Sequence, residues 1–561
     1  MKYSFLIFLF IQLGFSQAEY PKDYFRNPLD IQLILAGNFA ELRSNHFHSG
    51  LDIKTDNQEG LNVYSVGDGY VSRIKVSFFG YGKAIYITHP NGYTSVYGHL
   101  KKFSPKIEAY IKQCQYQKES YEVEMFPGPS KFPIVKGEFI ALSGNTGGST
   151  APHLHFEIRD NEERPINPML FGIDIKDTRA PFVTKIYAYA KDETSVVNHS
   201  NNKVELRLIP DKNGNYTAEK VEAYGTIGFG ISSNDKQDLA PNNNGLYNIQ
   251  TFFNGNKNLE IDFRRFSFDE SKHINRFIDY ELYKTKKTSI QKLFVEKGNP
   301  LSLFKEVEND GYINVEDNTS SVYKIKIQDF KGNETWITIP IVGKKEETSI
   351  VKERLKSDYY VVANQTTNFQ KDRVSVYIPA NTFYDDTYLD FDVKSDTLKL
   401  DKDVIPLQNN YSIYYDISHY KEEDKSKLYV AELRGYYKRP NYIYTYRKGD
   451  SLVGRTNNLG TFALETDNVK PKITPVNFSN DKWISKENFL KVKISDDLSG
   501  ISNYRATING KWILMEYEYK TDMLTYDFSD NVISEAKNNL KIIVTDNVGN
   551  SSTFEATFFR K

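Results

Sequence analysis

The stretch Gly144–Ile158 reads GNTGGSTAPHLHFEI, and the interpretation of the chain starts from it. It begins as a turn rich in Gly, Asn, Ser and Thr and continues as a short apolar strand with a His-x-His pair. Alternate side chains of a strand share a face, so His153 and His155 project together while Leu154 and Phe156 point the other way. Two imidazoles on one face begin a metal site, and its other ligands must come from elsewhere.

Two upstream motifs supply candidate partners. The motif FHSGLDIKT places His48 and Asp52 four residues apart, which keeps both on one side of a strand or a helix. The motif YGHL contains His99. Six of the nine histidines precede residue 156, a crowding that scattered core or surface histidines would not produce.

Length and composition narrow the class of protein. A chain of 561 residues is too long for one core, so we expect three or four domains. The net charge of −1 shows no excess of basic residues of the kind that binds nucleic acid. Aromatic residues make up 14 %, and the apolar runs are rich in Val, Ile, Thr and Tyr, which favours a mainly β fold.

The first 18 residues, MKYSFLIFLFIQLGFSQA, have the pattern of a signal peptide. Lys2 precedes an apolar run, and small residues that suit cleavage follow it. A buried N-terminal helix is the alternative. No later segment is long and apolar enough to span a bilayer, so we expect an exported chain with no transmembrane segment after signal removal.

Residues 19–172 are predicted to form one domain of short antiparallel strands. Pro90-Asn91-Gly92 is a strong hairpin signal, and the second strand of that hairpin delivers His99 at its end. Residues 101–136 are expected to be an insert that opens with a helix, because Ser104-Pro105 is a typical helix start. The single cysteine, Cys114, excludes an intrachain disulfide, and we expect a small buried side chain rather than a catalytic thiol.

A repeat appears after residue 172. The segments that start at Asp177 and Asp467 each precede a strand, and those that start at Asp329 and Asp546 each join two strands through a Gly-Asn turn. We therefore predict β-sandwich modules of the immunoglobulin-like type. Their predicted limits are 173–345 (with insertions), 346–466 (a β-rich middle module) and 467–561. Asp496-Asp497 and Asp546-Asn547 have the chemistry for calcium, but turn formation accounts for both pairs.

The motifs FHSGLDI, YGHL and GGSTAPHLHFEI, in that order, resemble the lysostaphin-type (LytM-domain) zinc metalloendopeptidases, which cut peptidoglycan peptides. The resemblance covers about residues 35–172. It implies one zinc ion per chain, with two histidines and an aspartate as metal ligands and two further histidines as the catalytic pair. The implied metal ligands are His48, Asp52 and His155, and the implied catalytic pair is His99 and His153.

This chain departs from the family pattern in two places. Ala151 stands where the family usually has Gly, and the stretch between His99 and Gly137 is longer than usual. The first change leaves the implied site intact, and the second bears on the edge of the cleft and its specificity.

The implied site agrees with general zinc chemistry. Two imidazoles and one carboxylate leave a fourth position for water, which is typical of catalytic zinc. The other two histidines can move protons and stabilise an oxyanion, or they can instead orient the ligands. His46 is expected at the cleft or surface and His89 to be exposed, whereas Arg43 has two readings, a substrate carboxylate contact or a surface salt bridge.

We therefore predict an exported zinc endopeptidase that hydrolyses peptidoglycan cross-links in the periplasm or cell envelope, or outside the cell. Cross-links that contain D-amino acids are the suggested substrate, and glycine bridges are the alternative. A second hypothesis is a catalytically silent module that recruits or activates another wall hydrolase. A third is an adhesin or envelope scaffold, because most of the chain reads as β modules, which are also candidates to bind an envelope partner.

Overall fold

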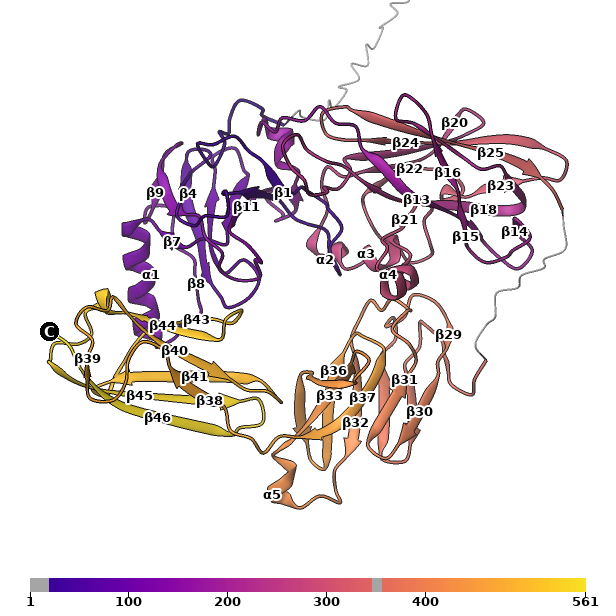
Figure 1. Cartoon of the computed structure of the whole chain (residues 1–561). Coiled ribbons are helices and arrows are strands. Elements are labelled where there is room, and N and C mark those ends of the chain that lie inside the picture. Colours follow the sequence, from indigo (N-terminus) through magenta and orange to yellow (C-terminus); the bar gives the residue numbers. More distant parts are fainter. Residues whose placement is uncertain (1–19, 346–355) are drawn as a thin grey trace, which may run out of the picture.

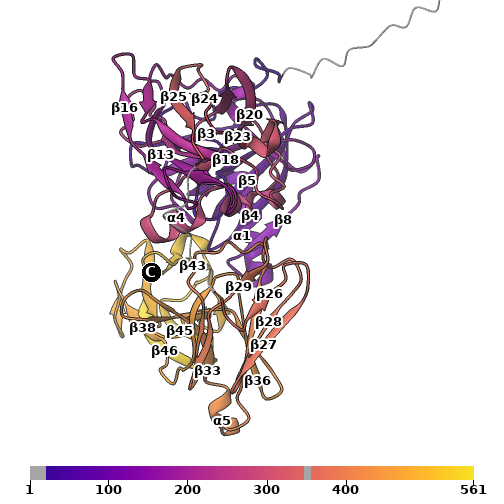
Figure 2. The ribbon, with the colours of Figure 1, turned by 90° about the vertical axis from the view of Figure 1, so that its right-hand side faces the viewer.

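The computed structural model describes residues 20–345 and 356–561, and the predicted signal peptide lies outside these residues. Strands far outnumber helices in the described chain, which confirms the mainly β fold class. Figure 1 shows four parts arranged around a ring, and Figure 2 shows the first two parts above the last two. Within the described ranges, no helix is long and apolar enough to cross a membrane.

The first part contains a nine-stranded sheet in which every neighbouring pair is antiparallel. Its main path runs β1 (Leu35–Gly37), β2 (Leu51–Lys54), β11 (His153–Arg159), β6 (Thr94–Gly98), β5 (Lys83–Thr88), β4 (Gly69–Val76) and β8 (Val123–Met125). Two short strands pair with interior strands of this path, β12 (Pro165–Ile166) with β11 and β9 (Pro133–Ile134) with β4. A separate three-stranded sheet is formed by β3 (Asn62–Tyr64), β10 (Phe139–Leu142) and β7 (Lys102–Phe103).

Local signals in this part are confirmed. Strands β5 and β6 pair around the predicted hairpin turn, and His99 follows β6 directly. Helix α1 (Pro105–Lys118) starts after Ser104, and Cys114 is a buried free thiol on it. On β11, Leu154 and Phe156 are fully buried, as the alternation of the strand predicts.

The second part is a 13-stranded sheet with the short helices α2 (Phe268–Ser271), α3 (Ile274–Phe277) and α4 (Tyr280–Lys286). Its main path runs β15 (Val204–Leu206), β13 (Phe182–Ala190), β18 (Val221–Asn234), β25 (Glu334–Gly343), β24 (Ser320–Gln328), β19 (Asn248–Phe253), β20 (Asn256–Asp262) and β22 (Phe304–Val307). One continuous hydrophobic cluster fills this part and the first. The two parts are therefore packed as one body.

The last two parts have separate cores. The third part contains two five-stranded sheets. The strand order of the first is β27 (Thr367–Lys371), β28 (Val374–Ile378), β32 (Tyr411–Asp416), β36 (Ser451–Thr456) and β35 (Thr445–Lys448). The strand order of the second is β30 (Phe391–Lys394), β31 (Thr397–Leu400), β37 (Gly460–Thr466), β33 (Leu428–Arg434) and β34 (Arg439–Tyr442). The fourth part contains a four-stranded and a five-stranded sheet. The four-stranded sheet has the order β38 (Lys472–Pro475), β40 (Phe489–Ser495), β44 (Met523–Asp527) and β43 (Met515–Glu518). The five-stranded sheet has the order β39 (Lys482–Trp483), β46 (Ser551–Phe559), β45 (Lys537–Asp546), β41 (Ile501–Ile508) and β42 (Lys511–Trp512).

The predicted turns at Asp329 and Asp546 join β24 to β25 and β45 to β46, respectively. Both pairs are antiparallel, as expected for hairpins. The immunoglobulin-like class and the exact domain limits stay predictions.

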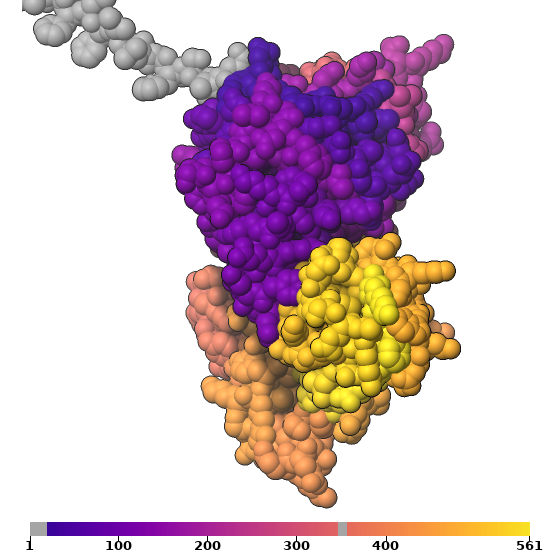
Figure 3. Space-filling model, turned by 90° about the vertical axis from the view of Figure 1, so that its left-hand side faces the viewer, coloured from indigo at the N-terminus to yellow at the C-terminus, as the bar shows by residue number. Residues whose placement is uncertain are grey.

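The fourth part packs against the first, as Figure 3 shows. The buried Lys83 ammonium lies 2.9 Å from a carboxylate oxygen of Glu516. The Tyr116 hydroxyl of α1 donates to Asp530 at 2.7 Å. Lys520 donates to the backbone carbonyl of Ser149 at 3.1 Å, so the C-terminal part contacts the turn that leads into β11.

Replacing Glu516 by alanine is expected to loosen this contact. The substitution leaves the buried Lys83 ammonium without its carboxylate, which costs about 1–3 kcal/mol for a buried donor that loses its partner. The expected results are an earlier unfolding step of the C-terminal part and a larger radius of gyration by small-angle X-ray scattering. The matched control is Glu555→Ala, which removes only a half-exposed pair with Lys541 and is worth about 0–1 kcal/mol. An unchanged radius of gyration for Glu516→Ala would show that the Lys83–Glu516 ion pair does not hold the fourth part against the first.

Candidate metal centre

Strand pairing brings the predicted site residues together. His155 on β11 lies directly opposite Asp52 on β2, and His48 sits in the loop just before β2. On its other side His155 pairs with Gly98 of β6, so His99 reaches the same end of the sheet. Opposed residues of an antiparallel pair have Cβ atoms about 4.5–5.5 Å apart, which is close enough to share a ligand.

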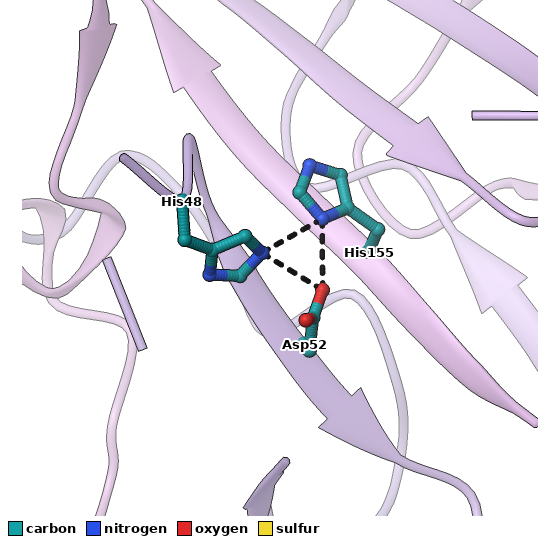
Figure 4. Close-up of side chains that lie close together, drawn as sticks. All are labelled: His48, Asp52 and His155. Atoms are coloured by element: carbon teal, nitrogen blue, oxygen red, sulfur yellow. Dashed lines mark hydrogen bonds and ion pairs between the residues drawn. The ribbon is translucent and has the colours of Figure 1, made fainter. Parts of the chain in front are cut away.

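Figure 4 shows the His48, Asp52 and His155 side chains converging. The Nε2 atom of His48 lies 2.9 Å from Asp52 Oδ1 and 3.1 Å from His155 Nδ1. The Asp52 Oδ1 to His155 Nδ1 distance is 2.8 Å. All three side chains are buried, so few water molecules reach the three converging atoms.

Hydrogen bonds on the far side of each imidazole fix which nitrogen carries a hydrogen. His48 Nδ1 lies 2.7 Å from the carbonyl oxygen of Asn38, and His155 Nε2 lies 2.8 Å from the carboxylate of Glu157. Both partners only accept, so Nδ1 of His48 and Nε2 of His155 are the donors. In the neutral rings, two nitrogen lone pairs and one carboxylate oxygen therefore face each other and require a cation between them.

The pKa shifts show the same demand for positive charge. Burial lowers the pKa of the His155 imidazole, but hydrogen bonds with Asp52 and Glu157 outweigh burial and raise it to about 9. Burial raises the pKa of Asp52, but the adjacent His48 and the two histidines of β11 beside it hold it well below its usual range. In the absence of a metal, a proton on His155 supplies the missing charge.

The donor set fits zinc. Two imidazole nitrogens and one carboxylate oxygen are common zinc ligands, at about 2.0–2.2 Å from the ion. A tetrahedral ion at that distance holds its donors about 3.3 Å apart, a few tenths of an ångström wider than the separations observed here. A small outward movement of the side chains would therefore admit the ion.

His99 and His153 lie beside these three residues. Their ring centroids are 4.7 Å apart, and His153 Nε2 is 3.3 Å from Asp52 Oδ1. Each Nδ1 lies 2.8 Å from a backbone carbonyl, of Thr146 for His99 and of Ala151 for His153. Both rings therefore keep Nε2 as an acceptor when neutral, and that atom of His153 is buried without a hydrogen-bond partner. Burial, followed by the charges of neighbouring histidines, lowers the pKa of His99 to about 3.

The glycine-rich turn before β11 is shaped by close backbone packing. Gly147 has φ +71°, and a Cβ there would lie 2.3 Å from the Gly82 nitrogen. A Cβ on Gly144 would lie 2.4 Å from the Lys101 nitrogen. Only glycine fits at these positions, so the turn can lie directly on the backbone that carries His99.

Sequence reasoning missed several residues that hold the ligands in place. Glu157 is fully buried and contacts His155, and Tyr81 stacks on the His155 ring at a centroid distance of 4.9 Å. Glu157 shares strand parity with His153 and His155, so the alternation of β11 could have found it. Tyr81 comes from the loop before β5 and has no comparable signal.

The structure also tests the predictions made for Arg43, His46 and His89. Arg43 forms a salt bridge, and its partner is Asp52 at 3.0 Å, so it holds a predicted ligand instead of lying on the open surface. His46 is exposed and contacts Asn45. The prediction that His89 is exposed is wrong. Its ring is buried, with Nδ1 2.7 Å from the Asp68 carbonyl oxygen and Nε2 2.8 Å from a serine hydroxyl.

Replacing Glu157 by glutamine is expected to weaken zinc binding by about 10–100-fold, the usual cost of losing a carboxylate that orients a metal-bound histidine. Glutamine keeps the size of the side chain but removes the negative charge that holds the hydrogen of His155 on Nε2 and leaves Nδ1 free to bind the metal. Competition with a chelator of known zinc affinity measures the change. Glu163→Gln is the control, because Glu163 pairs with the far side of Arg159 and is mostly exposed. Equal zinc affinity in the two variants would contradict the role of Glu157.

Comparison with known proteins gives two domain matches. Residues 46–116 and 130–168 match the model of peptidase family M23. The gap between the two matched segments falls within the predicted insert of residues 101–136. Residues 358–467 match a Zu5-like domain, which corresponds to the third part of the structure.

The curated relatives match about a quarter of this chain. A protein of Neisseria meningitidis named DD-carboxypeptidase/endopeptidase Mpg is 34 % identical over 122 residues, which cover 22 % of this chain and 22 % of the relative. Peptidoglycan DD-endopeptidase ShyA of Vibrio cholerae is 30 % identical over 171 residues, which cover 28 % of this chain and 34 % of the relative. The chain thus spans about a quarter to a third of the length of these relatives. The solved catalytic domain of lysostaphin from Staphylococcus simulans is 24 % identical, with a TM-score of 0.18, over 24 % of this chain and 87 % of that domain.

Proposed function

We propose, from the premise that the chain carries an N-terminal peptidase M23 domain, that it is a zinc-dependent endopeptidase of the cell envelope. Its proposed substrate is the peptide cross-link of peptidoglycan. Relatives named as peptidoglycan DD-endopeptidases favour cross-links that contain D-amino acids over glycine bridges.

One observation carries the proposal. Two imidazole nitrogens and a carboxylate oxygen lie 2.8–3.1 Å apart, and the other nitrogen of each ring is already hydrogen-bonded to an acceptor. The cluster needs a positive charge at its centre, which a proton on His155 supplies in the metal-free protein and a metal ion would supply in its place. In this proposal His48, Asp52 and His155 hold zinc, with a fourth position left for water or substrate.

Zinc bound there would polarise the scissile carbonyl and lower the pKa of water toward neutrality. The protein supplies the proton transfers. Burial holds the pKa of His99 low, so its ring is neutral at neutral pH and its Nε2 lone pair is available as a hydrogen-bond acceptor. His153 offers a second nitrogen acceptor 3.3 Å from Asp52 Oδ1, and once protonated either ring can donate to the leaving amine. The backbone carbonyls of Thr146 and Ala151, in the turn over residues 144–151, fix both rings.

The direct test measures zinc content and product masses together on the mature protein. About one zinc per chain and release of shorter peptides from cross-linked muropeptides are expected, and the masses identify the bond. Parallel assays on a D-amino-acid cross-link and a pentaglycine peptide decide between the two substrates. A zinc-loaded protein that cuts neither would contradict the endopeptidase proposal.

Zinc binding is expected to release about one proton per chain near neutral pH. The raised pKa of His155, about 9, means that the metal-free ring carries a proton below that pH, and zinc must displace it. Proton release should fall toward zero as the pH rises through 9, and zinc affinity should rise over the same range. Titration calorimetry in buffers of different ionisation enthalpy measures the protons released. A binding enthalpy that does not depend on the buffer would contradict this prediction.

A further inference from the structure

A second candidate metal site lies where the first part of the chain meets the second. A cavity of about 30 Å³ is lined there by the carboxylates of Asp177, Asp235 and Asp329, with Asn38 and Asn244 beside them. One oxygen from each carboxylate lies within 4.8 Å of the other two. The volume holds a single ion or water molecule.

The protein compensates the charge in this cavity only in part, because Asp177 and Asp329 accept hydrogen bonds from nearby N–H groups and Asp235 Oδ1 does not. Asp235 and Asp329 are 4 % and 3 % exposed, and Asp235 Oδ1 is buried without a hydrogen-bond partner. Among the described residues, no lysine or arginine forms an ion pair with any of the three carboxylates. Lys331 also lines the cavity, but its ammonium pairs with Asp174. Burial and then the charges of its two neighbours raise the pKa of Asp235 to about 8.

The repeat of the chain provides an internal comparison. The equivalent cluster in the fourth part contains Asp467, Asp496 and Asp546. Each of these carboxylates accepts hydrogen bonds from turn N–H groups, at 2.7–3.2 Å. Turn formation therefore accounts for the second cluster. In the first cluster Asp177 and Asp329 accept equivalent turn hydrogen bonds, and the difference lies in Asp235 Oδ1, which is buried without a hydrogen-bond partner.

We propose that Asp177, Asp235 and Asp329 bind one calcium ion. Three carboxylates without nitrogen or sulfur donors are a hard, all-oxygen set, which excludes a preference for zinc and suits calcium or magnesium. Magnesium usually keeps several of its water molecules, and a cavity of this size has no room for them. Calcium exchanges water for protein oxygens more readily.

This site goes beyond the proposed peptidase activity, but it lies next to the zinc site. The carbonyl of Asn38 accepts the hydrogen bond from His48, and its side-chain amide exchanges two hydrogen bonds of 2.8 Å with Gly245 of the second part. Bound calcium would hold together the contact between the first and second parts that Asn38 bridges. It would thereby fix the position of the loop that carries the zinc ligand His48.

The test titrates calcium into the zinc-loaded full-length protein after traces of calcium have been removed. One saturable site per chain by calorimetry, and a thermal midpoint that rises with calcium, are expected. Asp235→Asn should weaken calcium binding at least tenfold and should raise the midpoint of the calcium-free protein, because it removes repulsion between buried carboxylates. Asp496→Asn, in the second cluster, is the control and should bind calcium like the wild type.

Three results would overturn the proposal. The first is no saturable binding up to about 10 mM calcium, well above the weakest range of extracellular calcium modules. The second is binding that survives Asp235→Asn, and the third is magnesium binding as tight as calcium binding. If Asp235→Asn does not fold, Asp177→Asn replaces it, because Asp177 is half-buried. None of these results depends on peptidase activity, so the two proposals can fail independently.

Discussion

His155→Ala is expected to abolish zinc binding and to lower the rate of cross-link cleavage by at least about 10³-fold, because removing one preorganised electrostatic group already costs about 10²–10³. The Nδ1 atom of His155 lies 2.8 Å from Asp52 and 3.1 Å from His48, so it is one of the three atoms that converge on the proposed zinc position. Alanine leaves two ligands, too few for a zinc site of the catalytic type. Metal analysis and muropeptide release, measured on the same sample, check both effects.

The matched control is His46→Ala. His46 lies two residues before His48 in the same loop, but its ring is exposed and its Nδ1 lies 2.7 Å from the Asn45 side chain. It should retain one zinc and wild-type cleavage. A thermal unfolding curve for each variant separates loss of the metal from loss of the fold. Full zinc content in a folded His155→Ala protein would remove this residue from the ligand set.

The convergence of the predicted ligands follows from strand geometry. Alternation placed His153 and His155 on one face, and an antiparallel neighbour that carries Asp52 brings the carboxylate opposite His155. The family resemblance is confirmed for the first part by the M23 match. The roles of the five residues as ligands and catalysts stay predictions, and the experiments above test them.

Long-range packing explains what the sequence could not show. His89 follows a hairpin strand and looks exposed, but Phe25 packs on its ring and Asp68 accepts its hydrogen bond. Likewise, Lys520 reaches Ser149 across 371 residues of chain. No local pattern encodes such contacts, because they depend on how separate parts of the chain are docked.

The complete site also bears on the alternative functions. A silent module would be expected to lose a ligand or a catalytic histidine. Here all five predicted residues lie at one end of the sheet, and the ligand triangle requires a cation. In our proposal the complete set of residues argues for catalysis over recruitment alone, and the two remaining histidines are the residues on which that distinction depends.

His99→Ala and His153→Ala are each expected to keep one zinc per chain while lowering the rate of cleavage by about 10²–10⁴-fold, the usual contribution of a general acid or base. Neither ring belongs to the three converging ligands, and each has its Nδ1 next to a backbone carbonyl, so Nε2 is the nitrogen that can exchange a proton. Zinc analysis, the rate at saturating substrate and the pH–rate profile of each variant measure the effect.

The alternative role, in which these histidines only orient the ligands, predicts a different pattern. Loss of an orienting residue lowers zinc affinity by about 10–100-fold, and added zinc should then restore the rate. Loss of a proton carrier leaves the affinity unchanged, the rate does not recover with zinc, and one limb of the pH–rate profile disappears. Because the pKa of His99 is lowered to about 3, its removal should affect the acid limb, where the neutral ring becomes protonated and stops accepting a proton. Rescue of His99→Ala by zinc would therefore assign this residue to positioning and leave proton transfer to His153.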